Sequence, residues 1–135
     1  MRDLAAGQII AGKYRLESLI GHGGMGSVWR ARHVTLEMPV AIKFMGAHAE
    51  GDRESRQRFE REAKALGTLL TPYIVRVTDH GVEQGSPYLV MELLEGEDLS
   101  TRLARDKRLG IPETSRILLQ VARGRYAPQA YHDFI

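Results

Sequence analysis

Apolar and polar residues alternate along short stretches in the first third of the chain. Residues 14–20 (YRLESLI) and 27–34 (SVWRARHV) both show this alternation, and residues 38–45 (MPVAIKFM) form a short apolar run that contains one lysine. A period of two residues is typical of a half-buried β-strand. Because the connections between the stretches are short, the simplest topology is an antiparallel meander of three strands.

The period changes in the middle of the chain. Between Glu54 and Leu70 (ESRQRFEREAKALGTLL), apolar residues recur at steps of four, three and four, at Phe59, Ala63, Leu66 and Leu70. This spacing predicts one apolar stripe of an amphipathic helix. Two further strand-like stretches follow, IVRVTDHG and SPYLVMELLEG, and a turn at residues 84–86 separates them.

Beyond residue 98 the pattern is helical again. Leu99 and Leu103 predict a short amphipathic helix. Pro112 then predicts the first turn of another helix, where its missing N–H leaves no hydrogen bond unmade. Taken together, the chain is expected to be an α+β domain built on a five-stranded antiparallel sheet.

Composition excludes several classes of function. The chain has 135 residues, a formal net charge of +2 and no cysteine, which excludes disulfides, cysteine nucleophiles and cysteine-based zinc sites. Its basic residues are spread along the chain, so we expect no nucleic-acid partner. Its five histidines show no ligand spacing, and we expect no metal site. Without a signal peptide or an apolar run of about 18 residues, the expectation is a cytoplasmic protein with no membrane segment.

Four glycines stand within six positions of the stretch IGHGGMGSVWRA, residues 20–31. In a dinucleotide-binding unit such glycines open a helix, but here a strand pattern follows them. A Walker A loop is excluded because no Gly-Lys-Ser or Gly-Lys-Thr follows. The stretch therefore predicts a glycine-rich hairpin whose backbone can approach a phosphate chain; the alternative is a plain mobile hairpin.

One lysine and one glutamate are predicted to face the same interior. Lys43 lies inside the apolar run VAIKFM, on the face shared with Ala41 and Met45. On the predicted helix, Glu62 falls within the apolar stripe, one turn from Phe59. Because burying an isolated charge is costly, we predict that Lys43 and Glu62 pair with each other. The alternative for Lys43 is an edge-strand side chain that reaches water.

In this order, these features resemble the N-terminal lobe of a protein kinase, and most closely that of the bacterial-type serine/threonine kinases. GHGGMGSV matches the family's G-x-G-x-x-G-x-V, and VAIK matches its lysine-strand motif. REAKAL is similar to the regulatory helix, and YLVMELLEGEDL to the last strand and the hinge. The resemblance covers residues 12–124. It implies a kinase-like N-lobe, with a five-stranded antiparallel sheet and one packed helix, followed by the first helices of an incomplete C-lobe.

The resemblance also implies roles for single residues. Lys43 would hold the α- and β-phosphates of ATP while paired with Glu62, and these two are the candidate catalytic residues. Met91 would be the gatekeeper behind the adenine, whose edge would bond the backbone of Glu92 and Leu94. The candidate nucleotide-binding residues implied in this way are Ile20, Gly21, His22, Gly23, Gly24, Met25, Gly26, Ser27, Val28, Ala41, Lys43, Met91, Glu92 and Leu94.

After Gly124 the sequence departs from the family pattern. A kinase continues into H-R-D-x-x-x-x-N and D-F-G, which supply the catalytic aspartate and the magnesium ligands. Here the chain reads RYAPQAYHDFI, in which His132-Asp133-Phe134 matches neither motif. Pro128 also interrupts what would be a long helix. The expectation is a truncated or frame-shifted gene, although a genuine small protein is the alternative, and a chain without the family's magnesium ligands.

Three functions compete at this point. The first is the ATP-binding portion of a serine/threonine kinase that acts on proteins, inactive as this fragment. The second is a non-enzymatic nucleotide-binding or protein-interaction module. The third, a dinucleotide oxidoreductase, is disfavoured because no helix follows the glycines. The expected division of the chain is an N-terminal extension (1–13), an N-lobe with the ATP-binding loop (14–94), the hinge and first C-lobe helices (95–124), and a divergent tail (125–135).

Overall fold

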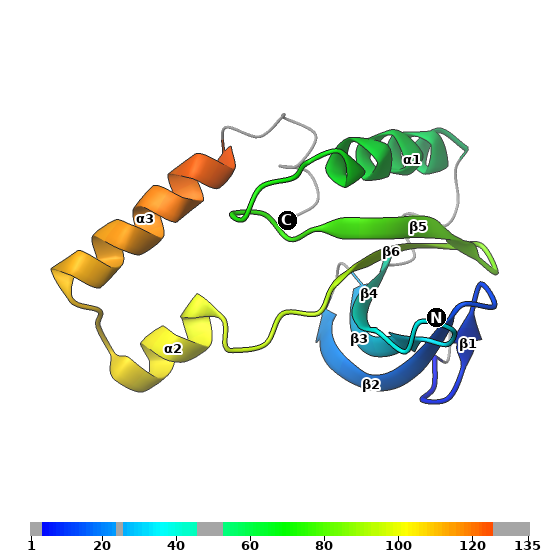
Figure 1. Ribbon diagram of the computed structural model, residues 1–135, viewed down its shortest axis with the longest axis horizontal. Helices are drawn as coiled ribbons and strands as arrows, with labels where there is room; N and C mark the ends of the chain where they lie inside the picture. Colours follow the sequence, from blue (N-terminus) through cyan, green and yellow to red (C-terminus); the bar gives the residue numbers. More distant parts are fainter. Residues whose placement is uncertain (1–3, 24–25, 46–52, 126–135) are drawn as a thin grey trace.

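The computed structural model describes residues 4–23, 26–45 and 53–125. Within these ranges the chain forms one antiparallel sheet, one helix that packs on it and two further helices to one side (Figure 1). Gly24, Met25 and the tail from residue 126 onward, which includes His132, lie outside the described residues.

The sheet has six strands rather than the five predicted. The strands are β1 (Ile9–Ile10), β2 (Tyr14–Gly23), β3 (Gly26–His33), β4 (Pro39–Met45), β5 (Val77–Glu83) and β6 (Ser86–Glu92). Their order is β1-β2-β3-β4-β6-β5, and every neighbouring pair is antiparallel. The prediction missed β1, because two residues are too few to show a period. Ile10 of this strand is completely buried.

Two separate hydrophobic cores cover the two faces of the sheet. On the first face, side chains from β1, β2, β3, β4 and β6 pack into one cluster: Ile10, Tyr14, Leu16, Trp29, Ala31, Ile42, Phe44, Tyr88 and Val90. On the second face, α1 (Arg53–Gly67) packs its stripe of Phe59, Ala63 and Leu66 against Val77 and Leu89. The predicted helix is confirmed, but it ends at Gly67, so Leu70 lies beyond it and is 79% exposed.

Asp79 on β5 joins regions from opposite edges of the sheet. β1 and β5 are the two edge strands, yet the Tyr14 hydroxyl at the start of β2 donates to Asp79 Oδ2 over 2.8 Å. Lys13 Nζ lies 3.4 Å from the same oxygen. Close by, the Ala11 N–H donates to Glu83 Oε2 over 3.2 Å. The sheet is therefore curled far enough for the β1–β2 turn to contact β5 (Figure 1).

These contacts perturb the acidities of both partners. Burial raises the pKa of Asp79, but the hydrogen bonds from Tyr14 and from the His80 N–H, together with Lys13, outweigh burial and lower it overall. Burial, followed by the hydrogen bond to the Asp79 carboxylate, raises the pKa of Tyr14. Near neutral pH, Asp79 is therefore an anion, and the Tyr14 hydroxyl keeps its proton and donates a hydrogen bond to it.

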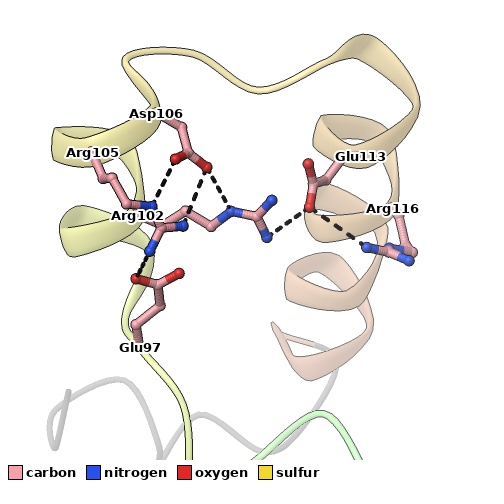
Figure 2. Close-up of polar contacts among 6 residues, drawn as sticks. All are labelled: Glu97, Arg102, Arg105, Asp106, Glu113 and Arg116. Carbon is pink, nitrogen blue, oxygen red and sulfur yellow. Dashed lines mark hydrogen bonds and ion pairs between the residues drawn. The ribbon is translucent and has the colours of Figure 1, made fainter.

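Beyond β6, an extended connection leads to α2 (Leu99–Asp106) and α3 (Ile111–Arg125), which stand to one side of the sheet (Figure 1). Asp98 caps α2 by accepting the Thr101 N–H over 2.6 Å. Arg102 links the two helices, because its Nε lies 3.2 Å from Asp106 and its Nη1 lies 2.8 Å from Glu113 of α3. Figure 2 shows the whole ion-pair network, which comprises Glu97, Arg102, Arg105, Asp106, Glu113 and Arg116.

The far end of α3 returns to the segment between α1 and β5. Arg123 Nη1 donates to the Tyr73 hydroxyl over 2.7 Å, and its guanidinium carbon lies 5.5 Å from the centre of the Tyr73 ring. A Cβ at Gly124 would lie 3.3 Å from the Tyr73 carbonyl oxygen, so a small residue suits this approach. Within the described part of the chain, none of the helices combines the length and the apolar character needed to cross a membrane.

We expect Asp79→Asn to lower the free energy of unfolding by about 1–2 kcal/mol at neutral pH, because it removes the charge from a partly buried hydrogen bond. The folded pKa of Asp79 lies below its unfolded value of about 3.9. Its contribution is therefore present above that unfolded value and is lost as the pH falls through the folded pKa. Urea unfolding at a series of pH values from about 3 to 7 measures both effects.

Asp106→Asn is the matched control for this prediction, because Asp106 is paired with Arg102 and Arg105 on an exposed helix. It should change stability little. If Asp79→Asn and the wild-type chain lost stability equally toward acid, the proposed contribution of Asp79 would be wrong.

Candidate nucleotide-binding site

The register of the three central strands brings four predicted site residues to one face of the sheet. Val28 pairs with Lys43, which in turn pairs with Leu89 on β6. One step along, Ala41 pairs with Met91. Directly opposed residues of antiparallel strands share a face, and Leu89 belongs to the core beneath α1. Val28, Ala41, Lys43 and Met91 therefore lie on the face that carries α1, as the alternation predicted for Lys43.

The strand β2 reaches this face through two bulges. Leu16 pairs with Ala31, but Ser18 pairs with Arg30, so Glu17 is an extra residue. Leu19 then pairs with Trp29, and Gly21 pairs with Val28, so Ile20 is a second extra residue. The regular alternation predicted over residues 14–20 is therefore wrong after Leu16. Each bulge shifts the pairing of β2 with β3 by one residue and bends the strand locally.

The glycines of the hairpin differ in what the fold requires of them. Gly26 has a φ of +125°, a conformation that side chains rarely adopt. Gly21 and Gly23 have no such φ, and a Cβ at either position would meet no atom within 4 Å. The folding of this chain therefore does not explain glycine at 21 or 23.

Other residues of the loop face away from this surface. Ser27 Oγ accepts the Trp29 Nε1–H over 3.2 Å, and Trp29 belongs to the opposite core. His22 pairs with Ser27 and so shares that face. For these two residues the backbone, rather than the side chain, is the group that a nucleotide under the hairpin would meet.

The described residues include Lys43 but not the side chain of its predicted partner. Lys43 is half-buried on β4, with α1 covering the same face of the sheet. Residue 62 lies within α1, but the Glu62 side chain lies outside the described residues. The ion pair between Lys43 and Glu62 therefore stays a prediction.

The residues predicted to form the hinge lie at the end of β6 and just past it. The Glu92 N–H donates to the Arg76 carbonyl over 3.0 Å, and the Arg76 N–H donates to Glu92 Oε1 over 2.8 Å. This exchange engages the Glu92 N–H within the chain. Leu94 lies two residues past the strand and is 64% exposed.

A carboxylate that the sequence analysis did not single out lies on the same surface. Glu17 Oε1 lies 2.8 Å from Arg32 Nε, and Glu17 Oε2 lies 3.2 Å from Arg30 Nε. The hydrogen bond from Arg32, followed by the contribution of Arg30, lowers the pKa of Glu17. The doubled polar pair Glu17–Ser18, which breaks the alternation, was the signal that could have revealed this bulge.

Across the described ranges, no three His, Asp or Glu side chains gather in an arrangement that could hold a metal ion. What the surface offers is a small residue at 41, a lysine two residues further along the strand, and a hairpin with open space at two glycines.

Known proteins share this arrangement. The profile of the protein kinase domain family matches residues 14–127. The serine/threonine-protein kinase PknH of Mycobacterium bovis is 40% identical over 119 residues, which are 88% of this chain and 20% of that protein. The serine/threonine-protein kinase pkn3 of Myxococcus xanthus is 41% identical over 120 residues, covering 88% of this chain and 22% of that kinase.

Solved structures agree with the sequence relatives. The crystal structure of the PknI kinase domain of Mycobacterium tuberculosis superposes with a TM-score of 0.79 at 30% identity, covering 88% of this chain and 48% of that domain. The chain thus spans about half of a solved kinase domain and about a fifth of the curated kinases. The chain belongs to the protein kinase domain family, and its described part resembles the bacterial serine/threonine kinases.

Proposed function

We propose that this chain is the ATP-binding part of a serine/threonine protein kinase domain that acts on protein substrates. The observation that carries the proposal is the glycine hairpin. At Gly21 and Gly23, neither the backbone conformation nor the packing requires a glycine. Binding of a phosphate chain by backbone N–H groups would require glycine there, because a side chain at either position would keep the backbone away from the phosphates.

The other candidate residues take roles according to the face they share. Lys43 lies opposite Val28, so its ammonium is placed to neutralise phosphates held beneath the hairpin. Ala41 leaves room for the adenine ring, with Val28 on one side and Met91 at the back. The Glu92 carbonyl and the Leu94 backbone would bond the edge of the ring. When bound, magnesium would neutralise part of the charge of the phosphates.

Lys43→Met tests the electrostatic part of the proposal. The change removes the cation but keeps a side chain of similar length, so ATP should bind roughly tenfold more weakly, as expected for the loss of one charge-assisted hydrogen bond of about 1.5 kcal/mol. Isothermal titration of the purified 135-residue chain with ATP measures this change. Lys64→Met, on the exposed side of α1, is the matched control and should bind ATP like the wild type. Equal affinity in wild type and Lys43→Met would place the nucleotide elsewhere.

Gly23→Ala tests the hairpin without disturbing the fold. Because a Cβ at this position meets no atom within 4 Å, the variant should unfold at the wild-type temperature. Its affinity for ATP should nonetheless fall about fivefold or more, since the backbone is held off the phosphates. Thermal unfolding and ATP titration of the same samples make the comparison. With a plain mobile hairpin the affinity for ATP would also stay at the wild-type value, and that outcome would favour a module that does not bind nucleotide through this loop.

We expect no protein phosphorylation by these 135 residues alone. Phosphoryl transfer depends on positioning the acceptor hydroxyl and on neutralising charge, and the sequence contains no H-R-D-x-x-x-x-N or D-F-G to do so. Transfer of radiolabel from ATP to a generic protein substrate, in the presence of magnesium, measures the activity. Label transferred by the purified chain and lost in Lys43→Met would contradict this expectation, because a contaminating kinase would be unaffected by that change.

A further inference from the structure

We propose that Glu17 is a positioning residue that sets the register of the glycine hairpin by holding two arginines of the neighbouring strand. The inference rests on the proposed function in one respect: Glu17 would determine which β2 side chain lies opposite Val28, where the nucleotide is proposed to bind. The register of β2 against β3 can be measured without any nucleotide.

The geometry of the bulge is the first step. Without a bulge, the pairing of Leu16 with Ala31 would continue as Glu17 with Arg30. Instead, Ser18 pairs with Arg30, and Glu17 is the extra residue between two pairs. From there its two carboxylate oxygens contact different arginines, Oε1 with Arg32 over 2.8 Å and Oε2 with Arg30 over 3.2 Å. A glutamate directly opposite Arg30 would face that residue, with Arg32 only diagonal to it.

In the described part of the chain, this end of β2 is held by its pairing with β3 and not by buried side chains. Tyr14 and Leu16 are buried, but the residues from Ser18 to Ile20 are all exposed, with Leu19 at 49% and Ile20 at 54%. Register is strongly specified only where one face of a strand is buried, and weakly elsewhere. Past Leu16, hydrophobic burial therefore contributes little to the choice of register, and the contacts of Glu17 become the deciding interaction.

A slip of β2 against β3 would change which β2 side chain lies opposite Val28. If the bulge at Glu17 closed, Ser18 would move opposite Trp29 and Leu19 opposite Val28. Leu19 would then occupy the face of Val28 and Lys43, where the described register places Gly21. A leucine in place of a glycine would block the approach of phosphates to the hairpin backbone. The contacts of Glu17 with Arg30 and Arg32, called the Glu17 clamp below, thus keep an open position opposite Val28.

Nuclear magnetic resonance of the 135-residue chain without nucleotide tests the register directly. In the wild type, we expect cross-strand nuclear Overhauser effects that connect Ser18 with Arg30 and Leu19 with Trp29, as the pairing requires. In Glu17→Ala these should weaken, and effects between Leu19 and Val28 should appear. Glu17→Gln, which keeps one acceptor oxygen, should be intermediate.

ATP titration of the same variants tests the consequence. Because a slipped hairpin does not bind, affinity falls with the fraction of correctly registered hairpin. Because the Glu17 clamp consists of two partly exposed ion pairs, we expect about a three- to tenfold loss in Glu17→Ala. Glu113→Ala is the matched control: Glu113 also contacts two arginines, Arg102 and Arg116, but on the helices far along the chain. This control should leave both the cross-strand effects and the affinity unchanged.

The outcomes separate the two proposals. Wild-type cross-strand effects in Glu17→Ala overturn the inference, whatever the affinity for ATP. Shifted effects support it, and a wild-type chain that then fails to bind ATP overturns the proposed function alone. Shifted effects in Glu113→Ala as well would show a general loss of structure rather than a specific role of Glu17, and would also overturn the inference.

Discussion

The position of β4 between β3 and β6 determines both where the cores form and where the candidate site lies. Ile42 and Phe44 are buried in one core, whereas Lys43 between them faces α1. A slip of one residue would exchange the two faces, sending the ammonium into a cluster of aromatic and aliphatic side chains. Because burying an unpaired charge costs more than any single hydrophobic contact returns, the apolar pattern and the lysine enforce the same register. The candidate site is thus a consequence of core packing.

Core packing also fixes the register of β2, but only over part of the strand. Its first half is anchored by Tyr14 and Leu16 in the core, and by the contact of Tyr14 with Asp79. Its second half, which leads to the glycines, has no buried side chain. Segments with few apolar contacts open at low free energy. A hairpin that admits a nucleotide benefits from such an end, provided that polar contacts still select one register.

Elements with a long, clean period were predictable from the sequence, and features that depend on distant partners were not. The strands that carry Val28, Lys43 and Met91, and the stripe of α1, follow from local periodicity. β1 is too short to show a period. The bond between Tyr14 and Asp79 joins residues 65 positions apart, and no local pattern encodes it. The bulges in β2 are an intermediate case, because the doubled pairs Glu17–Ser18 and Leu19–Ile20 mark both of them.

Different forces hold the sheet and the two later helices. The sheet and α1 are stabilised by two buried apolar clusters, which salt does not screen. By contrast, α2 and α3 expose large apolar side chains, among them Leu118, Leu119 and Val121, and an exposed ion-pair network links them (Figure 2). Such pairs are weak individually and weaken further as ionic strength rises. Among the described residues, the contact of Arg123 with Tyr73 joins α3 to the segment between α1 and β5. The candidate nucleotide surface, formed by β2, β3, β4 and β6, is held by the buried clusters and not by these exposed contacts.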